Sequence, residues 1–191
     1  DIGNSSSELI KKLYAIQYDF TNDENIENAE IVEKLKMKNS AAVFFTFGKD
    51  SLLTYAICKE IGIHPILIYV REPHLFSENH HKDKLMSAFK KKCNESIYTI
   101  NNHLGCLREA DGGWYGWELQ LTQYVFMILP IIYGEKAKYV FFSNEQSCND
   151  MFLDANEIMC NPVYEQSEEW MHHINQMLQD ITPSLSSVHS L

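Results

Sequence analysis

Short apolar runs alternate with segments of helical spacing along most of this chain. The run at residues 66–70 is unbroken, which suits a parallel strand that is covered on both faces of a sheet. Similar runs, rich in β-branched and aromatic residues, occur on either side of it. We therefore predict four strands, at residues 42–47, 66–70, 96–100 and 138–142.

Helical spacing follows the strands. Leu52, Leu53 and Ile57 recur as on one face of a helix. Gly62 is suited to end that helix, because glycine readily adopts the left-handed conformation of a C-terminal cap. Pro130 is expected to kink or end a long apolar helix near its end. The predicted helices span residues 50–61, 80–93, 114–133 and 165–179.

The alternation of strands and helices predicts an α/β fold, with a parallel sheet and right-handed crossovers. Ligands bind to such sheets at the carboxyl ends of the strands, near the point where the strand order reverses. We expect one domain at residues 39–181, a helical lead-in arm at 1–38 and a Ser-rich, disordered tail at 182–191. Residues 144–161 are expected to be a loop or a short helix.

The turn between the first strand and the first helix is the most informative stretch. The first N–H groups of a helix have no partner within it and favour an anion, so a strand, turn and helix N-terminus can cradle phosphate. Gly48 lets the backbone approach a ligand closely, and Lys49 adds a positive charge. Asp50 is a good N-cap that can also face a metal ion. An ordinary turn without a ligand would use similar residues.

The string Thr46-Phe47-Gly48-Lys49-Asp50-Ser51 resembles the Ser-Gly-Gly-x-Asp-Ser loop of the PP-loop ATP pyrophosphatases. The resemblance covers roughly residues 41–150. It implies a Rossmann-like sheet of the adenine nucleotide α-hydrolase type with helices on both faces, so that residues 39–181 would form a PP-loop nucleotide-binding domain. A bulky Phe47 in a glycine position looks like the sulfonucleotide reductase and sulfate adenylyltransferase branch. The chain has no Walker A string.

The resemblance implies an ATP-dependent adenylating enzyme that activates an acceptor and releases pyrophosphate and AMP. The turn from Thr46 to Ser51 would bind the nucleotide. Lys49 and Asp50 would be catalytic, because they and Mg²⁺ would stabilise the charge that develops on pyrophosphate. The sequence does not identify the acceptor, a small molecule or an RNA base.

Two other functions stay open. One is a sulfonucleotide reductase or a sulfate adenylyltransferase-like enzyme, although the last cysteine, Cys160, lies well before the C-terminal residue. The other is a nucleotide-binding module without catalysis. Formation of AMP and pyrophosphate from ATP distinguishes these possibilities.

A second group of polar side chains follows the fourth strand, at residues 143–150. In a parallel sheet this strand end faces the nucleotide turn. Glu145 is therefore expected to share Mg²⁺ with Asp50, since Mg²⁺ commonly takes one or two carboxylates together with phosphates. Asn144 is expected to contact the nucleotide. The alternative is that these side chains only cap a turn.

The end of the second strand offers three further candidates. The resemblance implies that Tyr69 and Val70 present backbone groups to adenine. Arg71 is suited to hold a phosphate or a carboxylate at the same edge. The alternative for Tyr69 and Val70 is a simple core strand.

The net charge of the chain limits the kinds of partner that we expect. The net charge of −10 argues against a broad nucleic-acid surface, which needs clustered, uncompensated basic residues. The basic residues that do cluster are expected on the solvated face of one helix. These residues are Lys82, Lys84, Lys90, Lys91 and Lys92.

Cysteine content and hydropathy suggest a location. Five cysteines without a Cys-x-x-Cys pair suit reduced thiols, so we expect a cytoplasmic protein. The longest apolar run, residues 124–133, is about half of what a bilayer span needs, so no membrane partner is expected. A homodimer is left open.

Overall fold

The computed structural model describes residues 36–73, 75–106, 120–181 and 187–190. All of them belong to one compact unit, Lys34–Leu191. The expected lead-in arm lies outside the described residues except at its end, where Lys38 already begins the first strand.

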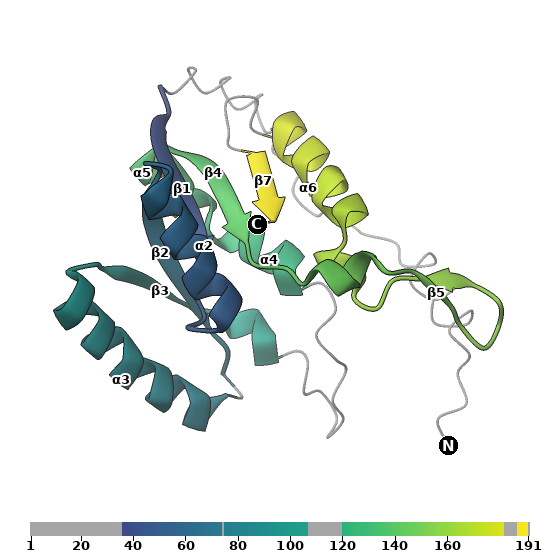
Figure 1. Ribbon diagram of the computed structural model, residues 1–191, viewed down its shortest axis with the longest axis horizontal. Coiled ribbons are helices and arrows are strands. Elements are labelled where there is room, and N and C mark those ends of the chain that lie inside the picture. Colours follow the sequence, from purple (N-terminus) through teal and green to yellow (C-terminus); the bar gives the residue numbers. More distant parts are fainter. Residues whose placement is uncertain (1–35, 74, 107–119, 182–186, 191) are drawn as a thin grey trace, which may run out of the picture. The chain divides into compact units, whose positions relative to one another are not determined.

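Five parallel strands form the central sheet, in the order β3-β2-β1-β4-β7 (Figure 1). They are β1 (Lys38–Phe44), β2 (His64–Arg71), β3 (Ile97–Asn101), β4 (Ala137–Phe142) and β7 (Ser187–Ser190). The predicted α/β fold with a Rossmann-like parallel sheet is confirmed.

Helices cover both faces of this sheet (Figure 1). Two lie on one face, α2 (Lys49–Glu60) and α3 (Phe76–Cys93). Three lie on the other face, α4 (Gln120–Met127), α5 (Leu129–Glu135) and α6 (Glu168–Ile181).

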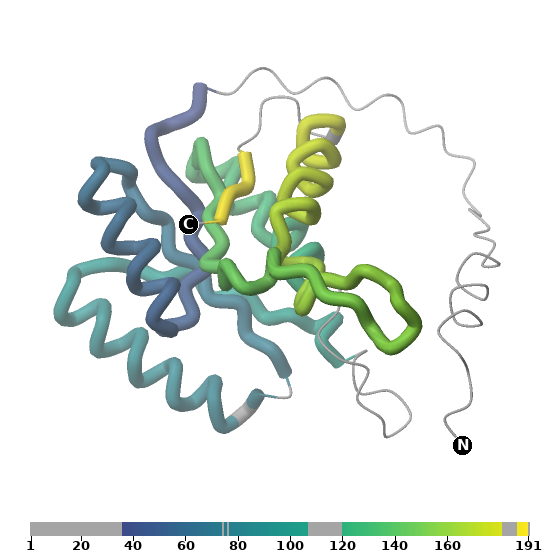
Figure 2. The backbone as a smooth tube through the Cα atoms, turned by 45° about the vertical axis from the view of Figure 1, so that its right-hand side comes forward, coloured from purple at the N-terminus to yellow at the C-terminus, as the bar shows by residue number. Residues whose placement is uncertain are grey.

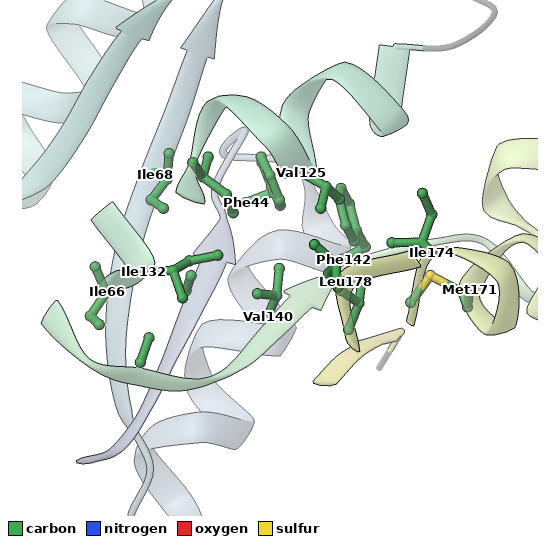
Figure 3. Packing of buried hydrophobic residues seen from close by; sticks show 14 of the residues in the cluster. Phe44, Ile66, Ile68, Val125, Ile132, Val140, Phe142, Met171, Ile174 and Leu178 are labelled. Carbon is green, nitrogen blue, oxygen red and sulfur yellow. The ribbon is translucent and has the colours of Figure 1, made fainter. Parts of the chain in front are cut away.

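The alternation of side chains along β1 divides the core into two layers. Ala42 and Phe44 pack toward α4, α5 and α6, in the cluster that Figure 3 shows. Val43 and Phe45 pack on the opposite face, where Cys58 of α2 is buried with them. Successive residues of a strand point to opposite faces, so an unbroken apolar run fills both layers at once.

The order of the strands reverses between β1 and β4. From β1 the chain passes to β2 and then to β3 on one side of the sheet, and β4 returns to the other side of β1. The carboxyl ends of β1 and β4 therefore flank the switch point, where open α/β sheets bind ligands.

The C-terminal tail differs from the prediction. Ser187–Ser190 form β7, which pairs with β4, where we expected a disordered segment. Val188 is buried, and the side chain of Asn175 bonds to both its N–H (2.7 Å) and its carbonyl oxygen (2.8 Å). Tertiary packing on α6 thus orders a short, polar edge strand that local composition did not suggest.

The long apolar helix that we expected is divided into two helices. The expected helix at residues 114–133 is described only from Gln120, and it is interrupted at Ile128. The expected interruption near Pro130 is confirmed, because Pro130 lies in the first turn of α5, where a backbone N–H is not needed. Gly62 follows the end of α2 with φ +75°, as predicted for a cap.

The expected loop at residues 144–161 contains short elements. These are the 3-10 helix η2 (Gln146–Asn149) and the antiparallel strands β5 (Phe152–Leu153) and β6 (Met159–Cys160). The resulting hairpin extends away from the central sheet (Figure 2). A second 3-10 helix, η3 (Tyr164–Gln166), precedes α6, which begins three residues later than predicted.

Candidate functional site

A cavity of about 490 Å³ opens at the carboxyl ends of β1, β2 and β4. Its position is the switch point of the sheet. Five of the predicted nucleotide-binding residues line it, namely Thr46, Ser51, Tyr69, Val70 and Asn144. The structure therefore brings together residues from three separate parts of the sequence.

Aromatic rings form the apolar wall of the cavity. The ring of Phe44 stacks on that of Phe142, with 4.3 Å between centroids, and on that of Tyr124 at 5.8 Å. Phe44 and Phe142 belong to the core cluster in Figure 3. A wall of this kind suits a flat, uncharged group such as a heterocyclic base.

The turn itself has an unusual backbone. Phe47 has φ +63°, the left-handed conformation that glycine favours. Gly48 is the N-cap of α2, and no side chain of the described residues caps this helix end. Asp50 lies in the first turn and is not the N-cap that we predicted. The first N–H groups of α2 are therefore not occupied by a capping side chain.

Two hydroxyl groups of the turn face the cavity. Ser51 is almost fully buried and its hydroxyl donates to the carbonyl oxygen of Gly48 at 3.0 Å. The hydroxyl of Thr46 accepts from the N–H of Gly48 at 3.4 Å. These contacts hold the hydroxyls beside the helix N-terminus.

Lys49 and Asp50, the predicted catalytic residues, do not line the cavity. The Lys49 side chain is 86% exposed, and its ammonium group lies 3.6 Å from the carboxylate of Asp50. An exposed pair of this kind contributes little to stability. Their catalytic roles stay predictions.

Lys82 is a residue that the sequence analysis placed incorrectly. Its side chain is only 15% exposed, and its ammonium group donates to the carbonyl oxygen of Thr46 and lies 3.6 Å from Glu78. The other four lysines of the cluster are exposed as expected. Lys82 differs because the N-terminal half of α3 lies beside the carboxyl end of β1.

Tyr69 and Arg71 have different surroundings at the end of β2. The hydroxyl of Tyr69 donates to Asn79 at 2.9 Å. Burial, and then the nearby carboxylate of Glu78, raise the pKa of Tyr69 to about 12. Arg71 pairs with Asp83 of α3 and lines another cavity. It is therefore not brought to the first cavity.

Asn144 and Glu145 have different surroundings, although Asn144 also lines the cavity beside Glu145. Asn144 lines the first cavity, and its side-chain amide donates to the carbonyl oxygen of Gln166 at 3.3 Å. Glu145 is exposed and lines a second cavity of about 380 Å³. Asp50 lines neither of these cavities. The shared magnesium site of Asp50 and Glu145 stays a prediction.

Three carboxylates line the first cavity, those of Glu72, Glu78 and Glu165, and none of the described lining residues is basic. Oxygen ligands of this type suit a hard divalent cation such as Mg²⁺. Glu72 is already held in place, since it accepts from Asn102 and Tyr124 at 2.7 Å each. Within the described part of the chain no three His, Cys, Asp or Glu side chains form a metal-binding group.

Glu165 was predicted only as the start of a helix. Its buried carboxylate accepts from the N–H groups of Leu121 and Thr122 at 3.1 and 3.2 Å and from the hydroxyl of Thr122 at 2.7 Å. It therefore caps the N-terminus of α4 from a distant part of the chain. Only the tertiary fold places it there, so no local pattern could reveal it.

The chain matches no protein-family model, and a search of curated proteins finds no match. The class that the fold defines, a Rossmann-like α/β protein, is thus the identification that the structure supports. Among the described residues, no helix is long and apolar enough to cross a membrane.

Proposed function

We propose that this chain is an ATP-dependent adenylating enzyme of the ATP pyrophosphatase type, with its nucleotide at the switch point of the sheet. The observation that carries the proposal is the cavity at the ends of β1, β2 and β4, with the Thr46–Ser51 turn at its edge. The resemblance of that turn to the PP-loop supports the same assignment.

The two sides of the cavity suit different parts of ATP. The aromatic wall, with Phe44 and Tyr124, would accept the base and ribose. The phosphates would lie at the turn, where the uncapped N-terminus of α2 and the hydroxyl of Ser51 can donate to them. Lys82 is close enough to the turn to supply a positive charge.

The carboxylates of the cavity wall fit a Mg²⁺ ion that accompanies the phosphates, with Glu78 the least buried of them. Bound Mg²⁺ would neutralise charge on the leaving pyrophosphate. In the reaction an acceptor oxygen would form a bond to the α-phosphorus. The bond from the α-phosphorus to its bridging oxygen would break, and the electron pair would leave with pyrophosphate.

A binding module without catalysis is the second candidate, and the exposure of Lys49 favours it. A catalytic Lys49 would have to turn toward the phosphates when ATP binds, because its side chain is 86% exposed. If the chain is an enzyme, Lys49→Ala should lower turnover by about 10²-fold, as for a lost donor to developing charge. A binding module would release no pyrophosphate at all.

The cytoplasm is the proposed location. All five cysteines are free, and Cys58 and Cys148 are buried. Burial raises the pKa of both thiols, which keeps them protonated and unreactive. Free thiols of this kind suit a reducing compartment.

The test is titration of ATP with excess Mg²⁺, together with an assay for pyrophosphate and AMP over a library of acceptors. Ser51→Ala should weaken ATP binding by about 1 kcal/mol or more, the scale of one hydrogen bond. Ser87→Ala is the matched control, because Ser87 is an exposed helical serine whose hydroxyl donates to a backbone carbonyl. Equal ATP affinity of both variants and the wild type would refute the proposed site.

A further inference from the structure

Exposed apolar side chains gather on the hairpin of β5 and β6 and at its base, within residues 151–164. Single apolar side chains are common on protein surfaces, whereas a group of them marks an interaction site. Each of seven large apolar side chains in this segment is between 44 and 62% exposed. We call them the hairpin patch: Met151, Phe152, Leu153, Ile158, Met159, Val163 and Tyr164.

Both faces of the hairpin carry members of the patch. In the register of β5 and β6, Leu153 lies opposite Met159 and Phe152 lies opposite Cys160. Neighbouring residues of a strand point to opposite faces, so Leu153 and Met159 share one face and Phe152 lies on the other. The hairpin extends away from the central sheet (Figure 2), and none of these side chains belongs to the two core clusters of the described residues. The patch therefore has no core beneath it.

Hydrogen bonds, rather than apolar packing, hold the hairpin in shape. The carboxylate of Asp154 accepts from the backbone N–H groups of Asn156 and Ile158 at 2.8 and 2.9 Å, which fixes the turn. The side-chain amide of Asn161 donates to the carbonyl oxygen of Cys148 at 3.1 Å, which ties the base of the hairpin to η2. An isolated two-stranded hairpin is at best marginally stable in water, so these bonds pre-organise an arm with an accessible apolar surface.

The charges around the patch have one sign. Residues 139–191 contain no lysine or arginine. The backbone N–H of Ile158, and then that of Asn156, lower the pKa of Asp154, which keeps this carboxylate charged at the hairpin tip beside Glu157. Further exposed carboxylates flank the hairpin in the sequence, those of Glu145, Asp150, Glu168 and Glu169. The surface is thus apolar with acidic neighbours.

This charge selects among the partners that an apolar surface can have. Nucleic acids and anionic membrane surfaces would be repelled. Insertion into a bilayer would also bury the two carboxylates at the hairpin tip, at a high cost. A second copy of this chain carries the same net charge of −10 and would bring the same acids to a two-fold contact. A protein surface that combines apolar and basic side chains matches both features of the hairpin.

We propose that the hairpin patch is a docking arm for a segment of another protein that combines apolar side chains with Lys or Arg. Apolar side chains of the partner would pack on Leu153 and Met159, and its cations would face Asp154 and Glu157. Apolar contact would supply affinity, and complementary charge would select the partner and speed association. None of residues 151–160 lines the first cavity, so the proposal does not rest on the proposed function.

Two synthetic helical peptides are suitable probes, one of leucine and lysine and a matched one of leucine and glutamate. We expect the leucine–lysine peptide to shift the backbone amide NMR signals of Leu153 and Met159 in the wild-type chain. The signals of Ile61 and Leu104, exposed apolar residues on other elements, should not move. The leucine–glutamate peptide should leave all four signals unchanged. Added salt should weaken binding of the leucine–lysine peptide, because it screens exposed charges.

A double variant, Leu153→Ser with Met159→Ser, separates apolar contact from charge. It keeps every acid of the hairpin, so the affinity for the leucine–lysine peptide should fall at least about tenfold through lost apolar burial alone. The matched control is Ile61→Ser with Leu104→Ser. These residues have a similar exposed fraction and lie outside the patch, so binding should be unchanged.

Four results would each overturn the proposal. One is unchanged affinity for the leucine–lysine peptide in the folded double variant, and another is equally tight binding of the leucine–glutamate peptide. The third is a wild-type dimer, or wild-type binding to phosphatidylserine vesicles, that the double variant abolishes, because the patch would then serve a second copy or a membrane. The fourth needs no variant: the absence of any shift at Leu153 and Met159 up to the solubility limit of the leucine–lysine peptide.

Discussion

The hydroxyl of Thr54, on α2, lies 2.9 Å from the hydroxyl of Ser143, directly after β4. This hydrogen bond links the helix that follows the Thr46–Ser51 turn to the second polar segment of the cavity. Thr54 is 1% exposed, so its hydroxyl cannot turn to solvent. The contact therefore fixes the distance across the switch point.

A double-mutant cycle measures this link. Thr54→Val and Ser143→Ala should each lower the free energy of unfolding by about 1 kcal/mol, the usual net value of a hydrogen bond. The double variant should lose less than the sum, with a coupling energy of about 0.5–1.5 kcal/mol from urea denaturation. Thr99→Val, at an exposed threonine, should change little. Additive losses would contradict the proposed link.

Phe47 stores backbone strain in the turn. A left-handed conformation costs a non-glycine residue roughly 1–2 kcal/mol. Its ring offsets this by packing on Phe45 and Phe89, at 4.8 and 5.8 Å between centroids.

Two variants separate strain from packing. Phe47→Ala loses the ring but keeps the strain, so it should be less stable than the wild type by about 1–2 kcal/mol. Phe47→Gly loses the ring and relieves the strain, so it should be more stable than Phe47→Ala by about 1 kcal/mol. Urea denaturation of both variants gives the comparison. A glycine variant less stable than the alanine variant would show that φ at this position is not strained.

The structural elements that have a strong local pattern could be predicted from the sequence. The apolar runs of β1 and β2 fill two core layers, so their strands and the α/β class follow directly from the order of residues. The position of the Thr46–Ser51 turn was predictable because a glycine follows the apolar run and helical spacing begins directly after it.

The remaining parts of the site depend on tertiary packing. β7 contains one buried apolar residue, Val188, so its pattern is too weak to reveal a strand. Lys82 lies on the same helix as the exposed lysines after it, and only the placement of α3 turns it toward Thr46. Glu165 reaches a helix more than forty residues away in sequence, as its contact with Leu121 shows.

Glu165 should be important for stability because it caps α4. Glu165→Gln removes the charge that complements the helix dipole and weakens its hydrogen bonds, so unfolding free energy should fall by about 1–3 kcal/mol. Glu169→Gln, at an exposed position in the first turn of α6, should cost less than about 1 kcal/mol. Thermal and urea unfolding check both. Similar losses for the two variants would mean that the buried cap has no special role.

The raised pKa of Tyr69 predicts how the stability of the protein depends on pH in the alkaline range. Its pKa is about 12 in the folded protein against an ordinary value of 10.0. Because the folded-state pKa is raised, the associated stability is fully present below pH 10 and is lost as the pH rises toward 12. The wild type should therefore lose stability across this window more steeply than Tyr69→Phe. Urea denaturation at several pH values measures the difference, and parallel pH profiles would contradict the raised pKa.

Under the proposed function, a variant of Lys82 should affect binding of the phosphates but not of the base. Lys82→Met keeps the apolar stem and removes the charge beside Thr46. ATP affinity should fall about tenfold, as expected for one lost charge-assisted contact, while adenosine affinity should be unchanged. Lys84→Met, at an exposed lysine of the same helix, is the matched control. An equal loss for adenosine and ATP would place the effect on the fold of the cavity, because adenosine has no phosphate for Lys82 to contact.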